Sequence, residues 1–126
     1  MSQRGIKKIL VVDDESSLTK FLHLVLTKDG YEVATAKDGR EGLRVFESIK
    51  PDLVITDMVM PDMEGIEFTR SLVKKAKSLP VIVMSGNAIG TKFLNTTCIL
   101  GARATLQKPF TIRELKESIT GVENSR

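Results

Sequence analysis

The sequence predicts an α/β fold in which helices cover both faces of a parallel sheet. Short apolar, β-branched runs alternate in strict order with longer segments of helical period. These short runs are apolar enough to be buried on both faces, which is typical of strands in parallel sheets. No linker, low-complexity tract or internal repeat interrupts the pattern. We therefore expect a single domain over residues 1–126, with its core at about 6–122.

Five runs in this pattern predict strands. They cover residues 6–12, 31–36, 52–57, 80–84 and 103–107. Right-handed crossovers between parallel strands place the loops that follow the strands along one edge of the sheet. Open α/β sheets bind their ligands beyond that edge, near the point where the strand order reverses.

The segment after the first strand carries the clearest helical period. Its apolar residues follow the i, i+3, i+4, i+7, i+8 spacing, and we expect the helix to begin at Ser16 or Ser17 and to end at Gly30. The residues of this stripe are Leu18, Phe21, Leu22, Val25 and Leu26. His23 lies beside the stripe, where an exposed position is the expectation.

Four more helices are expected, one after each remaining strand. The second covers residues 38–49, the third follows Pro61, and the fifth starts at about Thr111, which suits an N-cap. Their expected inward residues are Leu43, Phe46 and Ile49; Ile66, Thr69, Leu72 and Val73; and Ile112, Leu115, Ile119 and Val122. The fourth, residues 89–100, is rich in Gly, Thr and Asn, so we expect it to be short, frayed or mobile.

Composition narrows the class of protein. The chain is 41% hydrophobic and 28% charged, which is ordinary for a soluble globular protein. No apolar run is long enough for a signal-peptide core or a membrane span, and Cys98 is the only cysteine, so we expect a cytoplasmic protein. The net charge of +3 comes from Lys and Arg spread along the whole chain, which predicts a mixed solvated surface and no direct nucleic acid binding.

Acidic residues gather where the predicted strands end. Asp13 and Asp14 follow the first strand, and Asp57 ends the third. Two like charges about 4 Å apart repel each other by roughly 4 kcal/mol at an effective dielectric constant of about 20, so a positive group is expected beside them. Carboxylate oxygens suit Mg²⁺, which binds few protein groups and keeps several waters. The sequence therefore predicts a magnesium site.

Two further residues reach the same predicted edge. Ser85 follows the fourth strand and Lys108 follows the fifth. A hydroxyl and an ammonium group can both bind the oxygens of a phosphoryl group. Together with a carboxylate nucleophile and a metal, they form a set suited to phosphoryl transfer to an aspartate. The plain alternative for Ser85 is turn formation within Ser-Gly-Asn, and for Asp13 and Asp14 it is capping of the following helix.

Five short motifs give the chain a family resemblance. They are VVDDES at 11–16, ITDMVMPDMEG at 55–65, VMSGN at 83–87, Gly101-Ala102, and QKPF at 107–110. In this order and spacing they resemble the response-regulator receiver domain of two-component signalling, over residues 6–122. The resemblance implies a flavodoxin-like sheet of five parallel strands in the order 2-1-3-4-5, flanked by five helices.

The resemblance also implies a role for each site residue. Asp57 takes a phosphoryl group from the phosphohistidine of a sensor histidine kinase or a histidine phosphotransfer protein. Asp14, Asp57 and the backbone carbonyl of Val59 bind Mg²⁺, and Asp13 acts through a bound water. Ser85 and Lys108 hold the phosphoryl oxygens, and the Lys108-Pro109 bond is cis. The output is a changed surface for a downstream protein or output domain, so the chain is not an enzyme beyond its own phosphorylation and dephosphorylation.

Three positions depart from the family pattern or tune it. Thr105 stands where an aromatic residue commonly changes rotamer on activation, so aromatic coupling is not expected here. Val59 and Asn87 occupy positions that set how fast water removes the phosphoryl group. The segment between Ser85 and Lys108 is also one residue longer than usual and contains the poor fourth helix, so an atypical output face is expected.

Two other functions stay open from the sequence. A Mg²⁺-dependent phosphatase that forms an aspartyl-phosphate would need a general acid, and the position two residues after Asp57 is Val59. A binding scaffold that has lost phosphorylation is the other. No room remains after Val122 for an output domain, so we expect either a stand-alone receiver or a piece of a larger regulator or hybrid kinase.

Overall fold

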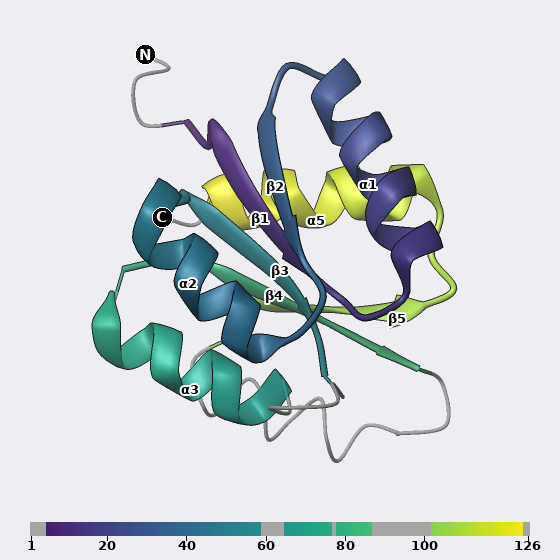
Figure 1. Cartoon of the computed structure of the whole chain (residues 1–126). Coiled ribbons are helices and arrows are strands. Elements are labelled where there is room, and N and C mark those ends of the chain that lie inside the picture. The colour runs from purple at the N-terminus through teal and green to yellow at the C-terminus, as the bar shows by residue number, and fades with distance from the viewer. Residues whose placement is uncertain (1–4, 59–64, 77, 87–101, 125–126) are drawn as a thin grey trace.

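A computed structural model of the chain describes residues 5–58, 65–76, 78–86 and 102–124. Five parallel strands form one sheet in the order β2-β1-β3-β4-β5, as the sequence analysis predicts, and helices lie on both of its faces (Figure 1). The strands are β1 (Lys8–Val12), β2 (Glu32–Ala36), β3 (Leu53–Asp57), β4 (Val81–Gly86) and β5 (Ala104–Lys108).

The helices described are α1 (Ser16–Lys28), α2 (Gly39–Ile49), α3 (Gly65–Lys75) and α5 (Ile112–Asn124). The fourth predicted helix, residues 89–100, lies outside the described residues. The arrangement is the flavodoxin-like one, in which each crossover helix returns the chain to the start of the next strand.

The strands differ from their predicted limits in two ways. β1 begins two residues later than expected, because the N–H of buried Ile6 donates to the Glu123 carboxylate, 2.8 Å away, rather than to a neighbouring strand. β4 and β5 extend further than expected, since Ser85 pairs with Gln107 and Gly86 with Lys108. Polar residues and glycine end an apolar pattern without ending the ladder of hydrogen bonds.

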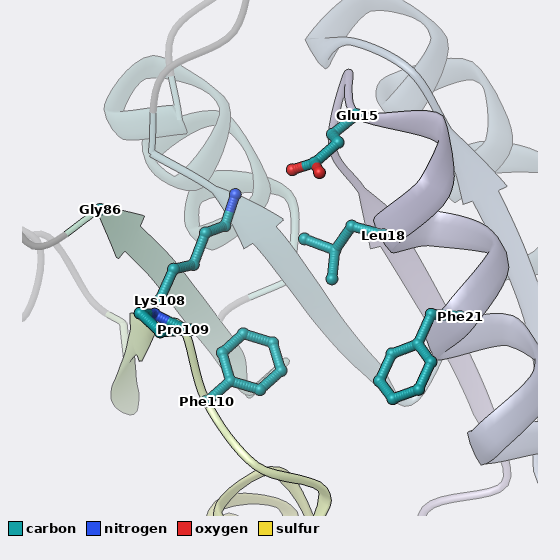
Figure 2. A pocket seen from close by; sticks show the side chains of 7 residues that line it. All are labelled: Glu15, Leu18, Phe21, Gly86, Lys108, Pro109 and Phe110. Atoms are coloured by element: carbon teal, nitrogen blue, oxygen red, sulfur yellow. The ribbon is translucent and has the colours of Figure 1, made fainter.

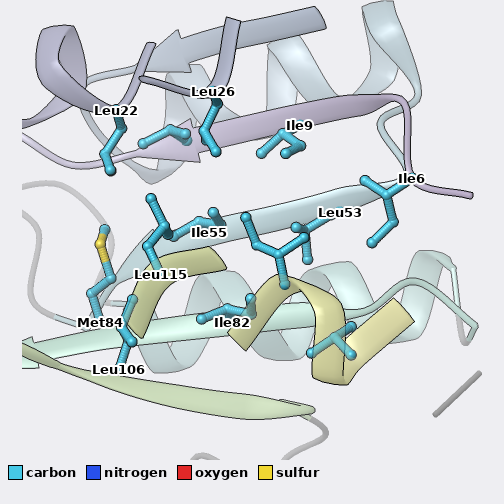
Figure 3. Close-up of a cluster of buried hydrophobic side chains, with 13 residues drawn as sticks. Ile6, Ile9, Leu22, Leu26, Leu53, Ile55, Ile82, Met84, Leu106 and Leu115 are labelled. Carbon is cyan, nitrogen blue, oxygen red and sulfur yellow. The ribbon is translucent and has the colours of Figure 1, made fainter. Parts of the chain in front are cut away.

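The sheet separates two hydrophobic clusters. Ile9 and Val11 face the layer of α1 and α5, whereas Leu10 and Val12 face the layer of α2 and α3, because successive side chains of a strand point to opposite faces. Figure 3 shows the first cluster, in which Leu22, Leu26 and Leu115 cover β1, β3 and β4. The second cluster contains Phe46, Phe68 and Leu72.

The apolar stripes of the helices are partly as predicted. Leu22, Leu26, Leu115, Ile119 and Val122 are buried as expected. The predicted burial of Phe21 and Ile112 is wrong, since 43% and 41% of their surfaces are exposed. Ile112 is the first residue of α5, and Phe21 lies beside the fully buried Leu22, at the edge of the apolar stripe. His23 is exposed, as predicted.

Specific residues cap the ends of the helices. α1 begins at Ser16, as predicted, and its N-cap residue is Glu15. Thr111 caps α5 as predicted, because its hydroxyl accepts the N–H of Glu114 while the Glu114 carboxylate accepts the N–H of Thr111. α2 ends at Ile49, and its C-cap residue is Lys50, whose φ of 49° lies in the left-handed region.

One glycine is needed for close packing of two helices. A Cβ on Gly42 of α2 would lie 2.9 Å from the ring of Phe68 on α3 and 3.2 Å from Val12 of β1. Phe68 is fully buried. The bare backbone of Gly42 therefore lets α2 approach both α3 and the sheet.

Candidate functional site

The carboxyl ends of the strands bring four chemically active residues together. Asp13 directly follows β1, Asp57 ends β3, Ser85 is the fifth residue of β4 and Lys108 ends β5. The backbone fixes two of them: the N–H of Asp13 donates to Ala36 of β2, and Asp57 is paired with Met84 of β4. The predicted edge is therefore the edge at which these residues lie.

Lys108 is the positive group expected beside the acids. Its Nζ lies 2.8 Å from Asp13 Oδ2 and 3.3 Å from Asp57 Oδ1. The Asp13 side chain is almost fully buried, with 1% of its surface exposed, while Asp57 and Lys108 remain partly open to solvent. One ammonium group thus joins the ends of β1, β3 and β5, and it offsets the cost of burying Asp13.

Three carboxylates form a candidate metal site. Asp13, Asp14 and Asp57 each offer an oxygen, and these oxygens lie within 4.8 Å of one another. Asp14 is exposed, so its oxygens can reach both solvent and an ion. Hard oxygen donors around a partly open position suit Mg²⁺, so the donor set fits that ion. We call these three residues, with Lys108, the acidic site.

The two central groups of the acidic site have shifted pKa values. Burial raises the pKa of Asp57, and the charge of Asp13 raises it further, although Lys108 and the N–H of Met58 offset part of this change. Burial alone would lower the pKa of Lys108, but its hydrogen bond to Asp13 and the charges of both acids raise it above the usual range. Lys108 is therefore a cation at neutral pH.

Of the other predicted site residues, Ser85 and Thr105 lie on the neighbouring strands β4 and β5. Ser85 is buried, with 2% of its surface exposed, one residue beyond Met84, the strand partner of Asp57. Thr105 is half-buried on β5 and pairs with Val83, so it lies two residues before the register position of Ser85. Val59 and Asn87 lie outside the described residues. The Lys108-Pro109 peptide bond is cis, as the resemblance implies.

An apolar groove opens beside the acidic site. Figure 2 shows the residues that line it, with the Lys108 side chain directed toward the Glu15 carboxylate and Leu18 between Phe21 and Glu15 on α1. We call this the Lys108 groove; its lining residues are Glu15, Leu18, Phe21, Gly86, Lys108, Pro109 and Phe110. The sequence analysis did not identify it. In the sequence Phe21 fits the apolar stripe of the helix, so the pattern carries no signal for the groove; only the exposure of Phe21 in the structure points to it.

The fold is a five-stranded parallel sheet, and the acidic site presents carboxylates at the ligand-binding edge of that sheet. Together these features are typical of one class of signalling domain. The chain belongs to the response regulator receiver domain family, whose profile matches residues 9–120. Receiver domains are signalling modules rather than conventional enzymes. Within the described residues, none of the helices has the length and apolar character needed to cross a membrane.

Several relatives support this assignment. The alkaline phosphatase synthesis transcriptional regulatory protein PhoP of Bacillus subtilis is 37% identical over 92% of this chain and 48% of its own length. The probable transcriptional regulator ycf27 of Cyanophora paradoxa is 40% identical over 90% of this chain and 46% of its own length. The chain thus spans about half the length of these curated relatives.

Solved structures agree with the fold. A response regulator receiver domain protein from Clostridium thermocellum has a TM-score of 0.89 and 35% identity, with 95% of this chain and 96% of that chain covered. The response regulator protein TrrA from Thermotoga maritima, solved in complex with Mg(2+)-BeF, has a TM-score of 0.82 and 35% identity, with 93% and 99% covered.

Proposed function

We propose that Asp57 is the phosphorylation site of this receiver. The observation that carries the proposal is the contact of Lys108 Nζ with Asp57, 3.3 Å away, next to two further carboxylates at the ligand-binding edge of the sheet. Asp57 lies at the end of a buried strand, where its position is fixed by Met84 and by the N–H of Met58. A fixed and partly exposed carboxylate beside a cation is suited to nucleophilic attack.

The reaction transfers one phosphoryl group. A carboxylate oxygen of Asp57 attacks the phosphorus of a phosphohistidine, and the P–N bond breaks with its electron pair left on the imidazole. Ser85 and Lys108 contact the phosphoryl oxygens and stabilise their charge. Asp13, Asp14, Asp57 and the backbone carbonyl of Val59 would hold Mg²⁺, which supplies positive charge next to the transferred group when bound. The similar protein TrrA was solved in complex with Mg(2+)-BeF, which supports Mg²⁺ as the ion.

The donor is a sensor histidine kinase or a histidine phosphotransfer protein. A protein donor must bring its histidine to Asp57. The Lys108 groove is suitably placed, because Lys108 both lines the groove and contacts Asp57. The groove is apolar along Phe21, Pro109 and Phe110, with Glu15 at its rim. We place the donor's apolar contact in this groove, and we propose that the two proteins meet in the cytoplasm.

Phosphorylation changes the charge at the acidic site. A phosphorylated Asp57 adds negative charge beside Lys108, which already binds Asp13. A shift of Lys108 toward the phosphoryl group would alter the end of β5 and bias a protein-binding surface for a downstream protein or output domain. Thr105, Val59 and Asn87 tune the switch and the lifetime of the phosphoryl group, and residues 1–126 act as one receiver domain.

The test uses a small acyl phosphate as donor. With Mg²⁺, intact mass spectrometry is expected to show one added phosphoryl group on the wild type and none on Asp57→Asn. Asp29→Asn is the matched control, because Asp29 is a carboxylate that pairs with Lys116, away from the acidic site. Equal labelling of the wild type and Asp57→Asn would contradict the assignment.

A further inference from the structure

The exposed side chains of α2, its C-cap residue and α3 are strongly basic. Six of them are cationic and only two are anionic. The cations are Arg40, Arg44, Lys50, Arg70, Lys74 and Lys75, and the anions are Glu47 and Glu67. Glu41 is half-buried, and its carboxylate accepts the N–H of Lys37. With Glu41 counted, the six cations and three anions of α2, its C-cap residue and α3 give a net charge of +3, equal to that of the whole chain. We call this surface the α2–α3 face.

The positive charges of the α2–α3 face are poorly compensated. Lys75 pairs with Glu47 at 2.8 Å across α2 and α3, which lie side by side (Figure 1). Within the part of the chain that the structure describes, the other five cations have no ion pair. Arg40 and Arg44, and likewise Arg70 and Lys74, are four residues apart on one helix surface. Like charges at that spacing destabilise a helix, so an anionic partner would reduce the electrostatic repulsion within each helix.

An apolar hollow lies within this face, between the C-terminal ends of α2 and α3. Phe46, Pro51, Ala76 and Leu79 provide its apolar lining, and Lys50, Lys75 and Glu47 lie around it. It is at the opposite edge of the sheet from Asp57, because Lys50 precedes the start of β3 and Asp57 ends that strand. We call it the α2–α3 hollow.

We infer that the α2–α3 face docks an acidic segment of a partner protein. Carboxylates of the segment lie against the arginines and lysines, and an apolar side chain enters the α2–α3 hollow. A nucleic acid fits this surface less well, since phosphates would leave the apolar lining unfilled. This surface goes beyond the proposed phosphorylation, and its use does not require Asp57.

The experiment measures binding of a fluorescein-labelled peptide of glutamates with a central leucine by fluorescence anisotropy. The wild type is expected to bind, and Arg44→Glu/Lys74→Glu to bind at least about tenfold more weakly. Lys20→Glu/Lys28→Glu is the matched control, because it reverses two exposed cations on α1 and changes the net charge of the chain by the same amount as Arg44→Glu/Lys74→Glu does. It is expected to change the affinity less than about twofold.

Comparisons of peptides, variants and ligands decide the result. Replacing the central leucine by serine is expected to weaken binding about tenfold if the hollow is used, and an unchanged affinity would overturn that part. Equal losses in the two charge-reversal variants, or no binding by the wild type, would overturn the docking surface. Tighter binding of a DNA oligonucleotide of equal charge would overturn the choice of partner. Asp57→Asn is expected to bind the peptide like the wild type, so failure of the proposed phosphorylation is distinguishable.

Discussion

Lys108 contacts two acids at once, Asp13 and Asp57, and it offsets only part of the effects that raise the pKa of Asp57. The pKa of Asp57 is raised by burial first and then by the charge of Asp13, while Lys108 offsets part of the shift. The folded state therefore holds a proton on this carboxyl at a higher pH than the unfolded chain does. Ionised Asp57 consequently lowers the free energy of unfolding at neutral pH, and that loss disappears as the pH falls through the raised pKa.

Because ionised Asp57 destabilises the folded chain, its replacement in Asp57→Asn gives a prediction in the absence of Mg²⁺. The substitution is expected to raise the free energy of unfolding at neutral pH. The gain is expected to shrink as the pH falls through the raised pKa of Asp57 and to vanish below the pKa of an ordinary aspartate. Urea unfolding at a series of pH values measures it. Asp29→Asn, at a partly exposed surface ion pair, is expected to change stability by less than about 1 kcal/mol. A loss of stability in Asp57→Asn at neutral pH would contradict the account.

At the scale of elements, the contact of α2 with α3 depends on Gly42. In an exposed helix interior, a change from glycine to alanine stabilises a protein by about 1 kcal/mol. At Gly42 the added methyl would meet the Phe68 ring at 2.9 Å, and Phe68 is fully buried. Gly42→Ala is therefore expected to lower the free energy of unfolding by about 1–3 kcal/mol, as measured by urea unfolding.

Gly121 provides the control for that prediction. It lies within α5, and a Cβ there would meet nothing within 4 Å. Gly121→Ala is expected to raise stability by about 0.5–1 kcal/mol. Effects of the same sign at both glycines would show that helix propensity, not the contact with Phe68, decides the outcome at Gly42.

The Lys108 groove gives a second prediction about an element, α1. Phe21→Ala is expected to lower kcat/KM for phosphotransfer from a protein donor about tenfold, because a half-exposed aromatic side chain is lost from the proposed contact. Phosphorylation by a small acyl phosphate is expected to be unchanged, since that donor needs no groove. The measurement compares the two donors in time courses of labelling.

Leu24→Ala is the matched control on the same helix. Leu24 is 67% exposed and does not line the Lys108 groove. Its substitution is expected to leave both reactions unchanged. Slower labelling of Phe21→Ala by the acyl phosphate would instead indicate a disturbed acidic site.

For the whole molecule, Mg²⁺ is expected to stabilise the folded chain through the three clustered carboxylates. A ligand that binds only the folded state adds about 1.4 kcal/mol for each tenfold excess over its dissociation constant. Thermal unfolding should therefore shift upward with Mg²⁺ concentration, return on addition of EDTA, and shift less in Asp14→Asn. The shift should also weaken as the pH falls through the raised pKa of Asp57, because a proton then competes for the same oxygen.

Most of the fold follows from local pattern. The five apolar runs locate the strands to within two residues, and the motifs at their ends bring the acids and Lys108 to one edge. Contacts between elements are less accessible to such reasoning. Phe68 was not among the predicted inward residues, because the predicted stripe contains Thr69 and Leu72 but omits the position four residues before Leu72. The role of Gly42 depends on that missed neighbour.

The surfaces are the least predictable part of the molecule. The Lys108 groove forms between α1 and the segment after β5, which are about 90 residues apart in sequence, so no local pattern contains it. The α2–α3 face arises similarly, since its exposed cations come from two helices that lie side by side only in the folded chain (Figure 1). Even spacing along a chain does not imply even spacing on a surface.

The sheet lies between two hydrophobic clusters, and the side chains of one cluster are separated from those of the other by the backbone of the strands. Substitutions on opposite sides share few partners, so their energetic effects should be close to additive. The layer of α1, next to the Lys108 groove, and the layer of α2 and α3 can therefore be altered separately by mutation. Recognition specificity on one side can diverge among related proteins while the other side keeps its ancestral contacts.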